Sequence, residues 1–343
     1  MADTFSVEEG TGIARYSREL LSGLTSSGVH VEPIAPSPPR LPFGMAINHA
    51  LKMPFLVHTE AGRFDLIHAT SPITALAFPL VSKPKVVTYH DLISLVWRNT
   101  SVGLHTRLLA PLFFRIARYA NRLIANSHQT KDDMMLHLGI PAEKISVVSW
   151  GISDKFKPAR NRERSSHVVG YLGTLSRTKG LPYLIGAIHA YTTGYPGVPV
   201  KLVVCGRRDL EYPRLSSLVH ELGLDQVVEF RGSVPDHKLV DTYNSFNVLV
   251  LPSEYEGFGL PILEAQTCGV PVIIREAAHI PAEVSKCCLK ATSEEDMAEK
   301  IHELLTNRNL RQTIIEEGLE YTEQFTWERT VRETVEVYEQ ILS

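Results

Sequence analysis

The sequence predicts an α/β protein with two doubly wound domains in series, and three observations support this. Its 343 residues are too many for one ordinary core and suit two domains of about 150 to 170 residues each. Short apolar runs alternate with longer segments of helical period, as in βαβ units. A polar, basic stretch at 155–166 interrupts this pattern, which then restarts. We therefore expect domains over 1–160 and 161–326.

In the first domain, short runs rich in β-branched residues predict strands, and the segments of 3.6-residue period between them predict helices. Strands are expected at 29–33, 66–69, 85–89, 122–125 and 145–148. Helices are expected at 12–26, 72–81, 105–120 and 129–138. A doubly wound sheet places its first strand before the glycine turn at 10–12. Residues 1–9 have no strand pattern, so three readings stay open: the strand is truncated, the true start lies upstream, or this is a shorter natural variant of the fold.

The same alternation in the second domain predicts a second parallel sheet. Strands are expected at 168–172, 201–205, 227–231, 248–252 and 272–274. Helices are expected at 181–191, 212–222, 236–244 and 261–268, and from 293 onward with a break near 325–327. Two such domains place a ligand cleft at the carboxyl ends of their strands, between the domains.

Composition excludes several classes of protein. With 44% hydrophobic and 21% charged residues the chain is typical of soluble globular proteins. Its 4 cysteines form neither a CxxC pair nor a disulfide framework, which indicates reduced thiols in a cytoplasmic protein. The sequence has no apolar run of about 18 residues and no charged-then-apolar leader, so we expect neither a spanning helix nor a secretion signal.

The net charge of −3 conceals an asymmetry between the halves. Residues 1–165 carry 19 basic and 13 acidic residues, whereas the remainder has a net charge of −9. Arginines punctuate the apolar helical stretch 105–120 and its end, at Arg107, Arg115, Arg118 and Arg122. They are interpreted either as snorkelling arginines of an ordinary amphipathic helix or as a peripheral contact with anionic lipid or a lipid-linked acceptor. No nucleic-acid motif accompanies them, so we exclude nucleic acid as a partner.

The segment 252–271, PSEYEGFGLPILEAQTCGVP, is the most informative part of the chain. It places Glu256 on a loop after a predicted strand and Glu264 about one turn into a helix that begins near Pro261. Gly257 and Gly259 allow a ligand to approach the backbone closely. The N–H groups of this helix end, including those of Phe258 and Leu260, suit a phosphate, and carboxylates suit the paired hydroxyls of a sugar or ribose.

This segment resembles the Glu-x7-Glu signature of the retaining glycosyltransferases of family 4, which have the GT-B fold. The similarity continues along nearly the whole chain. It includes the glycine turn 10–16, the strand ends 64–68, 87–91 and 124–127, the segment 150–152 and the closing Phe-Thr-Trp at 325–327. The resemblance implies two Rossmann-like domains facing a central cleft, with the last helix, 327–343, packed on the amino-terminal domain.

The resemblance also implies roles for individual residues. Lys179 matches the family lysine that holds the diphosphate, and the loop begins at Gly173. The arginine that often follows this glycine is replaced by Thr174, so the second cation is assigned to Arg177, against the alternative of a solvated loop arginine.

Two further assignments follow for the first domain. His90 matches a histidine that contacts the donor sugar, and Gly12 lies on the acceptor side. Asp91, which follows His90, either holds the acceptor hydroxyl or caps the next turn, whereas His68 is expected to be structural.

The function implied is transfer of a hexose, with mannose slightly favoured, from a nucleotide diphosphate sugar to a hydroxyl of a sugar or lipid-linked acceptor. Glu264 would bind ribose, and Glu256 with the backbone of 258–260 would bind the sugar. The resemblance implies no metal, no other cofactor, front-face attack with retention, and a cytoplasmic or inner-membrane-face location, in polysaccharide or glycolipid synthesis.

Two alternatives stay open. One is a GT-B enzyme that epimerises or hydrolyses the nucleotide sugar itself. The other is a catalytically silent protein that binds nucleotide sugar and regulates another transferase, which the replaced arginine and the missing first strand favour.

Overall fold

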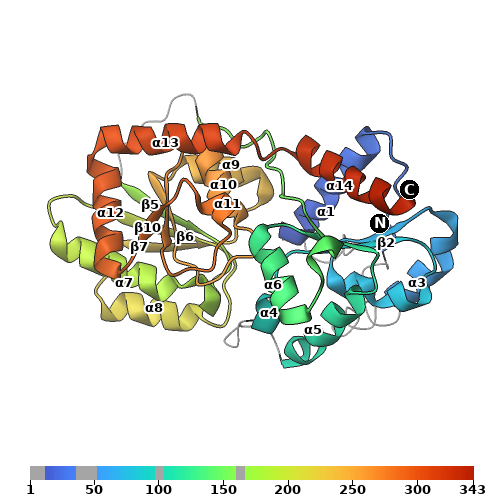
Figure 1. Ribbon diagram of the computed structural model, residues 1–343. Helices are drawn as coiled ribbons and strands as arrows, with labels where there is room; N and C mark the ends of the chain where they lie inside the picture. Colours follow the sequence, from blue (N-terminus) through green and yellow to red (C-terminus); the bar gives the residue numbers. More distant parts are fainter. Residues whose placement is uncertain (1–11, 36–51, 97–103, 160–166) are drawn as a thin grey trace. The chain divides into compact units, whose positions relative to one another are not determined.

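The computed structural model describes residues 12–35, 52–96, 104–159 and 167–343 (Figure 1). The chain divides into two compact units. Unit 1 comprises Met1–Arg98, Val102–Gly151 and Phe325–Ser343, and unit 2 comprises Asn99–Ser101 and Ile152–Gln324. Each contains a parallel sheet flanked by helices, which confirms the α/β class with two doubly wound domains. Most of the glycine turn at 10–12, the expected first strand and part of the linker lie outside the described residues.

Unit 1 has a parallel sheet in the order β1-β2-β3-β4, formed by Ile67–Ala69, Lys85–Tyr89, Arg122–Ala125 and Ile145–Val147. Its α-helices are α1 (Gly12–Ser26), α3 (Met53–Glu60), α4 (Ile93–Val96), α5 (Leu104–Ala117), α6 (His128–Leu138) and α14 (Trp327–Leu342). Short 3-10 helices are η2 (Ala61–Arg63), η3 (Pro72–Leu80) and η4 (Ala142–Lys144).

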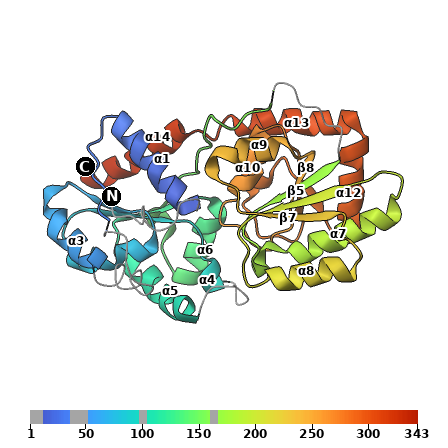
Figure 2. The same ribbon diagram turned by 180° about the vertical axis from the view of Figure 1, so that it is seen from behind.

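Helices cover both sides of the unit 1 sheet (Figures 1 and 2). Side chains alternate along a strand, so successive residues of β2 face opposite layers. The Tyr89 hydroxyl donates to the Phe114 carbonyl of α5, whereas Thr88 lies against Tyr16 of α1. The start of helix α14 packs closely against the backbone at Gly151, since a Cβ built at Gly151 would lie 2.3 Å from the Trp327 nitrogen.

Unit 2 has a parallel sheet in the order β10-β9-β8-β5-β6-β7. In chain order its strands are β5 (Val168–Leu172), β6 (Lys201–Cys205), β7 (Val228–Gly232), β8 (Val248–Leu251), β9 (Val272–Arg275) and β10 (Leu289–Ala291). Its helices are η5 (Arg177–Lys179), α7 (Leu181–Gly194), α8 (Tyr212–Glu221), η6 (Asp236–Lys238), α9 (Leu239–Asn244), α10 (Leu260–Thr267), α11 (Ala282–Ser285), α12 (Glu294–Thr306) and α13 (Arg308–Thr322).

One predicted strand is wrong, and several short elements were not predicted, among them α3, α4, α11 and β10. The apolar run 29–33 forms no strand, because it closes the end of α1: Gly28 has φ +86° and the Val29 N–H donates to the Leu24 carbonyl. The short helix α3 and the edge strand β10 have too few residues for a clear periodicity. No helix among the described residues is long and apolar enough to span a membrane.

Candidate functional site

The strand order of unit 2 marks where a ligand is expected. Consecutive strands run from β5 to β7 on one side, and the chain then returns to place β8 beside β5. Doubly wound sheets bind ligands at the carboxyl ends of the two strands where the order reverses. The loops that leave these two strands are 173–180 and 252–259, the segments that the sequence analysis singled out.

The backbones of these two loops are joined directly. The Glu254 N–H donates to the Thr178 carbonyl over 2.9 Å. Gly180 has φ +64°, and a Cβ built on it would lie 2.1 Å from the Pro252 carbonyl oxygen. Only glycine fits this close approach in a left-handed conformation. The relative position of the loops is therefore set by main chain, before any functional side chain is considered.

Lys179 and Glu256 meet across this junction. The Lys179 Nζ donates to Glu256 Oε1 over 2.7 Å, and the Ser253 hydroxyl donates to the same oxygen over 2.6 Å. Glu256 and Ser253 are buried, and the Lys179 side chain is 24% exposed. Charge-assisted hydrogen bonds are stronger where water is excluded, so this pair is a principal contact between the loops.

The start of α10 presents backbone N–H groups without a side-chain cap. Gly259 occupies the N-cap position with φ +96°, and Pro261 lies in the first turn. Gly257, Phe258 and Leu260 flank this turn, as the sequence predicted for a helix end that approaches a ligand.

Glu264 lies in the same helix and is buried. Its Oε2 accepts a hydrogen bond from the Tyr243 hydroxyl of α9 over 2.7 Å. Tyr243 is in turn fixed by the Phe156 ring at 5.9 Å. Neither Tyr243 nor Ser253 is predicted from the sequence as a partner of the two glutamates. Ser253 has a recognisable signal, since it lies three residues before Glu256, but Tyr243 has none.

The loop after β5 is also joined to the loop after β6. The Gly173 N–H donates to the Cys205 carbonyl, and the Leu175 N–H donates to the Arg207 carbonyl, each over 3.0 Å. This places the exposed Arg207 beside Thr174, where the family pattern has an arginine. Arg207 is not among the predicted site residues, although the pair Arg207-Arg208 follows the predicted strand 201–205 after a single glycine.

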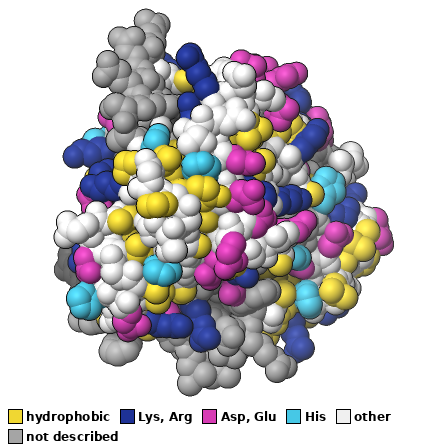
Figure 3. All heavy atoms as spheres, turned by 90° about the vertical axis from the view of Figure 1, so that its left-hand side faces the viewer, with side chains coloured by type: hydrophobic (Ala, Val, Ile, Leu, Met, Phe, Trp, Pro, Cys, Tyr) yellow, Lys and Arg dark blue, Asp and Glu magenta, His cyan; other side chains and the backbone are white. Residues whose placement is uncertain are grey.

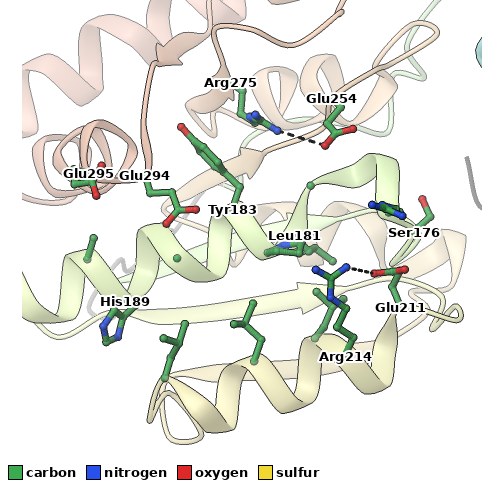
Figure 4. Close-up of a pocket in the computed structure, with 18 residues that line it drawn as sticks. Ser176, Leu181, Tyr183, His189, Glu211, Arg214, Glu254, Arg275, Glu294 and Glu295 are labelled. Atoms are coloured by element: carbon green, nitrogen blue, oxygen red, sulfur yellow. Dashed lines mark hydrogen bonds and ion pairs between the residues drawn. The ribbon is translucent and has the colours of Figure 1, made fainter. Parts of the chain in front are cut away.

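Arg177 lines a separate pocket of about 620 Å³ on unit 2 (Figure 4). In this pocket Arg275 lies 3.9 Å from Glu254 and 4.5 Å from the Tyr183 ring centre, and Arg214 lies 3.3 Å from Glu211. The outer face over α7, α8 and α12 shows acidic side chains among hydrophobic ones (Figure 3). Because cations and carboxylates alternate here, the pocket does not select a phosphate. Its lining includes neither Lys179, Glu256 nor Glu264.

In unit 1, His90 lies directly after β2 and is buried. Its Nε2 lies 2.6 Å from the Thr70 carbonyl oxygen, so Nε2 carries the proton and Nδ1 is an acceptor. Among the described residues, Nδ1 has no hydrogen-bond partner. Burial, opposed by the Thr70 hydrogen bond, lowers the pKa of His90 to about 4, so the ring is neutral at pH 7.

The neighbouring strand ends carry further polar atoms that are buried and unsatisfied within the described chain. Asn126 follows β3, and its Nδ2 donates to the His90 carbonyl over 2.8 Å, which leaves Oδ1 without a partner. Ser71 follows β1, and its hydroxyl is also unpartnered. Buried polar atoms normally have partners. The two acceptors at His90 and Asn126 suit a ligand that donates O–H groups and do not suit an anion.

His68 and Gly12 have different positions in unit 1. His68 is buried, with Nδ1 2.6 Å from the Tyr338 hydroxyl and Nε2 2.8 Å from the Thr88 hydroxyl. Both ring nitrogens of His68 are therefore hydrogen-bonded, one to a side chain of α14 and the other to a side chain of β2. This agrees with the structural role expected for His68. Gly12 is the first residue of α1, and the turn before it lies outside the described residues.

Two family models match consecutive parts of the chain. The model described as "Glycosyltransferase Family 4" matches residues 10–156, and the one described as "Glycosyl transferases group 1" matches residues 153–321. Curated relatives include a D-inositol 3-phosphate glycosyltransferase of Streptomyces bingchenggensis, 29% identical over 65% of this chain and 54% of that protein. Another, from Saccharomonospora viridis, is 26% identical over 83% of this chain and 72% of that protein. The chain thus spans about half to three quarters of their length.

Solved structures match the fold over nearly the whole chain. Sucrose-phosphate synthase from Thermosynechococcus elongatus has a TM-score of 0.77 and 22% identity, with 96% of this chain and 93% of that chain covered. Anabaena Alr3699/HepE, in complex with UDP and glucose, has a TM-score of 0.75 and 20% identity, with 100% and 98% covered.

We predict that unit 1 loses stability in mild acid. Burial lowers the pKa of His68 to about 3 and that of His90 to about 4. A histidine in the unfolded chain has a pKa of about 6.5. The unfolded chain therefore binds protons first, and stability present above about pH 6.5 is lost as the pH falls toward 4. At pH 5 each histidine should cost about 2 kcal/mol of unfolding free energy.

Thermal melts between pH 7.5 and pH 4.5 test this. The wild type should lose Tm steadily below about pH 6.5, and His90→Gln, which keeps a donor and an acceptor, should show a shallower loss. A wild-type Tm that does not change between pH 7 and pH 5 would contradict the assignment of both rings as buried and neutral.

Proposed function

The chain belongs to the family 4 glycosyltransferases with the GT-B fold, and from this we propose that it transfers a hexose from a nucleotide diphosphate sugar to a hydroxyl acceptor with retention of configuration. The observation that carries the proposal is the junction of the loops after β5 and β8, where Lys179 and Glu256 meet at the strand reversal. A cation and a hydrogen-bonding carboxylate at this point match the two halves of such a donor, its diphosphate and its sugar.

Donor binding would exchange partners within this pair. In the structure Glu256 accepts from Lys179. A diphosphate is a stronger anionic partner for Lys179, and the released carboxylate can then accept hydroxyls of the sugar. Arg177, or Arg207 beside Thr174, would add a second cation, and the α10 N–H groups with Gly173 would approach the phosphates. Preorganised cations stabilise the charge that develops on the leaving diphosphate. Glu264, held by Tyr243, would bind the ribose hydroxyls.

The strand ends of unit 1 would supply a neutral subsite. We assign His90 Nδ1 and Asn126 Oδ1 to sugar hydroxyls, because both are buried acceptors without a described partner. A pKa near 4 makes His90 a weak base at neutral pH, which favours orienting a hydroxyl over removing its proton. The leaving phosphate would then accept the proton of the acceptor in a front-face, metal-independent reaction. Gly12 would lie on the acceptor side.

Two donors are candidates for different reasons. The Gly-Thr-Leu sequence at 173–175 favours GDP-mannose, whereas a solved neighbour holds UDP and glucose. The acceptor is proposed to be a sugar or a lipid-linked sugar, in polysaccharide or glycolipid synthesis on the cytoplasmic side. Epimerisation or hydrolysis of the nucleotide sugar, or binding without turnover, are the competing functions.

A turnover experiment distinguishes these functions. The full chain is incubated with GDP-mannose or UDP-glucose, with and without a mixture of sugar and inositol-phosphate acceptors, in the presence of EDTA. We predict acceptor-dependent release of one nucleoside diphosphate and an axial linkage in the product by NMR. Epimerised or hydrolysed donor without acceptor dependence would overturn transfer, and an equatorial linkage would overturn retention. Loss of activity in EDTA that added metal restores would overturn metal independence.

Nucleotide binding is predicted to depend on Glu264. Glu264→Gln replaces a charged acceptor and should weaken nucleoside diphosphate binding about 10- to 100-fold, the worth of one or two charge-assisted hydrogen bonds. Isothermal titration with GDP and UDP measures this. Glu254→Gln is the matched control, because its side chain pairs with Arg275 at the separate pocket, and its Kd should stay within about twofold. Equal losses in both variants would refute the ribose assignment.

A further inference from the structure

The pocket of about 620 Å³ on unit 2 has the size of a small-molecule site. Helices α7 and α8 line it together with the start of α12 and the last residue of β9 (Figure 4). All of its lining residues belong to unit 2, and they do not include the residues assigned to the nucleotide sugar, Lys179, Glu256 and Glu264. The pocket is therefore a second place on unit 2 where a small molecule can bind.

Arg275 brings a guanidinium into this pocket with most of its donors unused. Glu254 lies 3.9 Å from it, beyond hydrogen-bond distance, and Arg275 donates no hydrogen bond to any other described residue. Its Cζ lies 4.5 Å from the centre of the Tyr183 ring, which holds the side chain in place. A guanidinium offers N–H donors in a fixed fork that matches a carboxylate. Arg275 can therefore bind a carboxylate of a ligand.

Glu294, the first residue of α12, provides the opposite charge. Its Oε2 lies against α7 at Gly186, so close that a Cβ at Gly186 would clash with it. The carboxylate has no hydrogen bond or ion pair with any described residue. Burial and the charge of Glu295 raise the pKa of Glu294, and Arg275 lowers it. A carboxylate that has lost water without gaining a partner is stabilised by a cation.

Arg275 and Glu294 are thus two opposite charges in one pocket that do not pair with each other. The Tyr183 side chain stands between them in Figure 4. Its hydroxyl is buried and has no hydrogen-bond partner among the described residues. Buried polar groups normally have partners. A ligand that carries both charges would satisfy both residues at once, whereas a simple ion would leave one of them unpaired.

The lining contributed by α8 and by the first turn of α7 is aliphatic. Leu181 of α7 and Leu215, Leu218 and Leu222 on the α8 side line the pocket. A sugar presents hydroxyls on all sides and would leave them without partners against these leucines. An aliphatic group would instead gain from leaving water there. The pocket therefore suits a ligand with two charges at one end and an apolar body.

We propose that this pocket binds an α-amino acid with an aliphatic side chain. The carboxylate of the amino acid would pair with Arg275, its ammonium group with Glu294, and its side chain would contact the leucines. Arg177 and Glu254 also line the pocket, so the ligand would touch both loops that carry the proposed donor site. The amino-acid site itself does not depend on the proposed transfer reaction.

Isothermal titration of the full chain with L-leucine tests the proposal. Two analogues each lack one charge: isocaproate has no ammonium group and isoamylamine has no carboxylate. Leucine should bind with a Kd of about 1 mM or lower, and at least about tenfold more tightly than either analogue, because each loses one charge-assisted contact. L-alanine, which keeps both charges, should bind several-fold more weakly than leucine, because it lacks the apolar body.

Variants assign each charge to its residue. Glu294→Gln should abolish the preference for leucine over isocaproate, and Arg275→Gln should abolish the preference for leucine over isoamylamine. Glu299→Gln and Arg308→Gln are the matched controls, since both residues are exposed and outside the pocket lining, and the Kd for leucine should stay within about twofold.

Circular dichroism melts identify any variant that fails to fold, and the comparison of ligands on the wild type then provides the independent test. The proposal is overturned if leucine binds the wild type no more tightly than its two analogues, or if test and control variants lose affinity equally. Failure of nucleotide binding or of sugar transfer would not change this result, so the two proposals fail separately.

Discussion

The hydrogen-bonded ion pair between Lys179 and Glu256 is the contact on which the account of this protein depends. It lies where the strand order of unit 2 reverses, on two loops whose backbones are already joined through Thr178 and Glu254. Ser253 gives the shared carboxylate oxygen a second donor. The half of the chain that contains this site has a net charge of −9, so a diphosphate can bind there only through local cations and a helix end.

The two units offer different chemistry. The unit 2 site combines charged groups in a fixed frame, which suits an anion with an attached polyol. The strand ends of unit 1 present neutral acceptors, because the Thr70 carbonyl fixes the proton of His90 on Nε2 and the His90 carbonyl fixes the amide of Asn126. Neutral acceptors of this kind suit the hydroxyl groups of a ligand and do not suit a phosphate.

The sequence predicted most of the fold, because a doubly wound sheet has strong local signals. The strands of unit 2 lie within one or two residues of their predicted positions, except for the edge strand β10. The run 29–33 was misread because a helix end also collects apolar residues, here around Gly28. At the site, the Glu-x7-Glu spacing singled out both glutamates, and a separate match to the family pattern singled out the lysine loop; the structure brings Lys179 and Glu256 together. Their partners Ser253 and Tyr243, and the tautomer of His90, depend on tertiary contacts that no local pattern encodes.

The most direct measurement is a double-mutant cycle on Lys179→Met and Glu256→Gln, read by both chemical denaturation and nucleoside diphosphate binding. Each single variant removes the opposite charge from a poorly hydrated partner and should lose about 1–3 kcal/mol of unfolding free energy, whereas the double variant should recover most of it. The double variant should nevertheless bind the nucleotide at least about tenfold more weakly than wild type, because the phosphate has lost its cation. Additive stability losses, or wild-type nucleotide affinity in the double variant, would contradict the claim that this pair both joins the two loops and receives the donor.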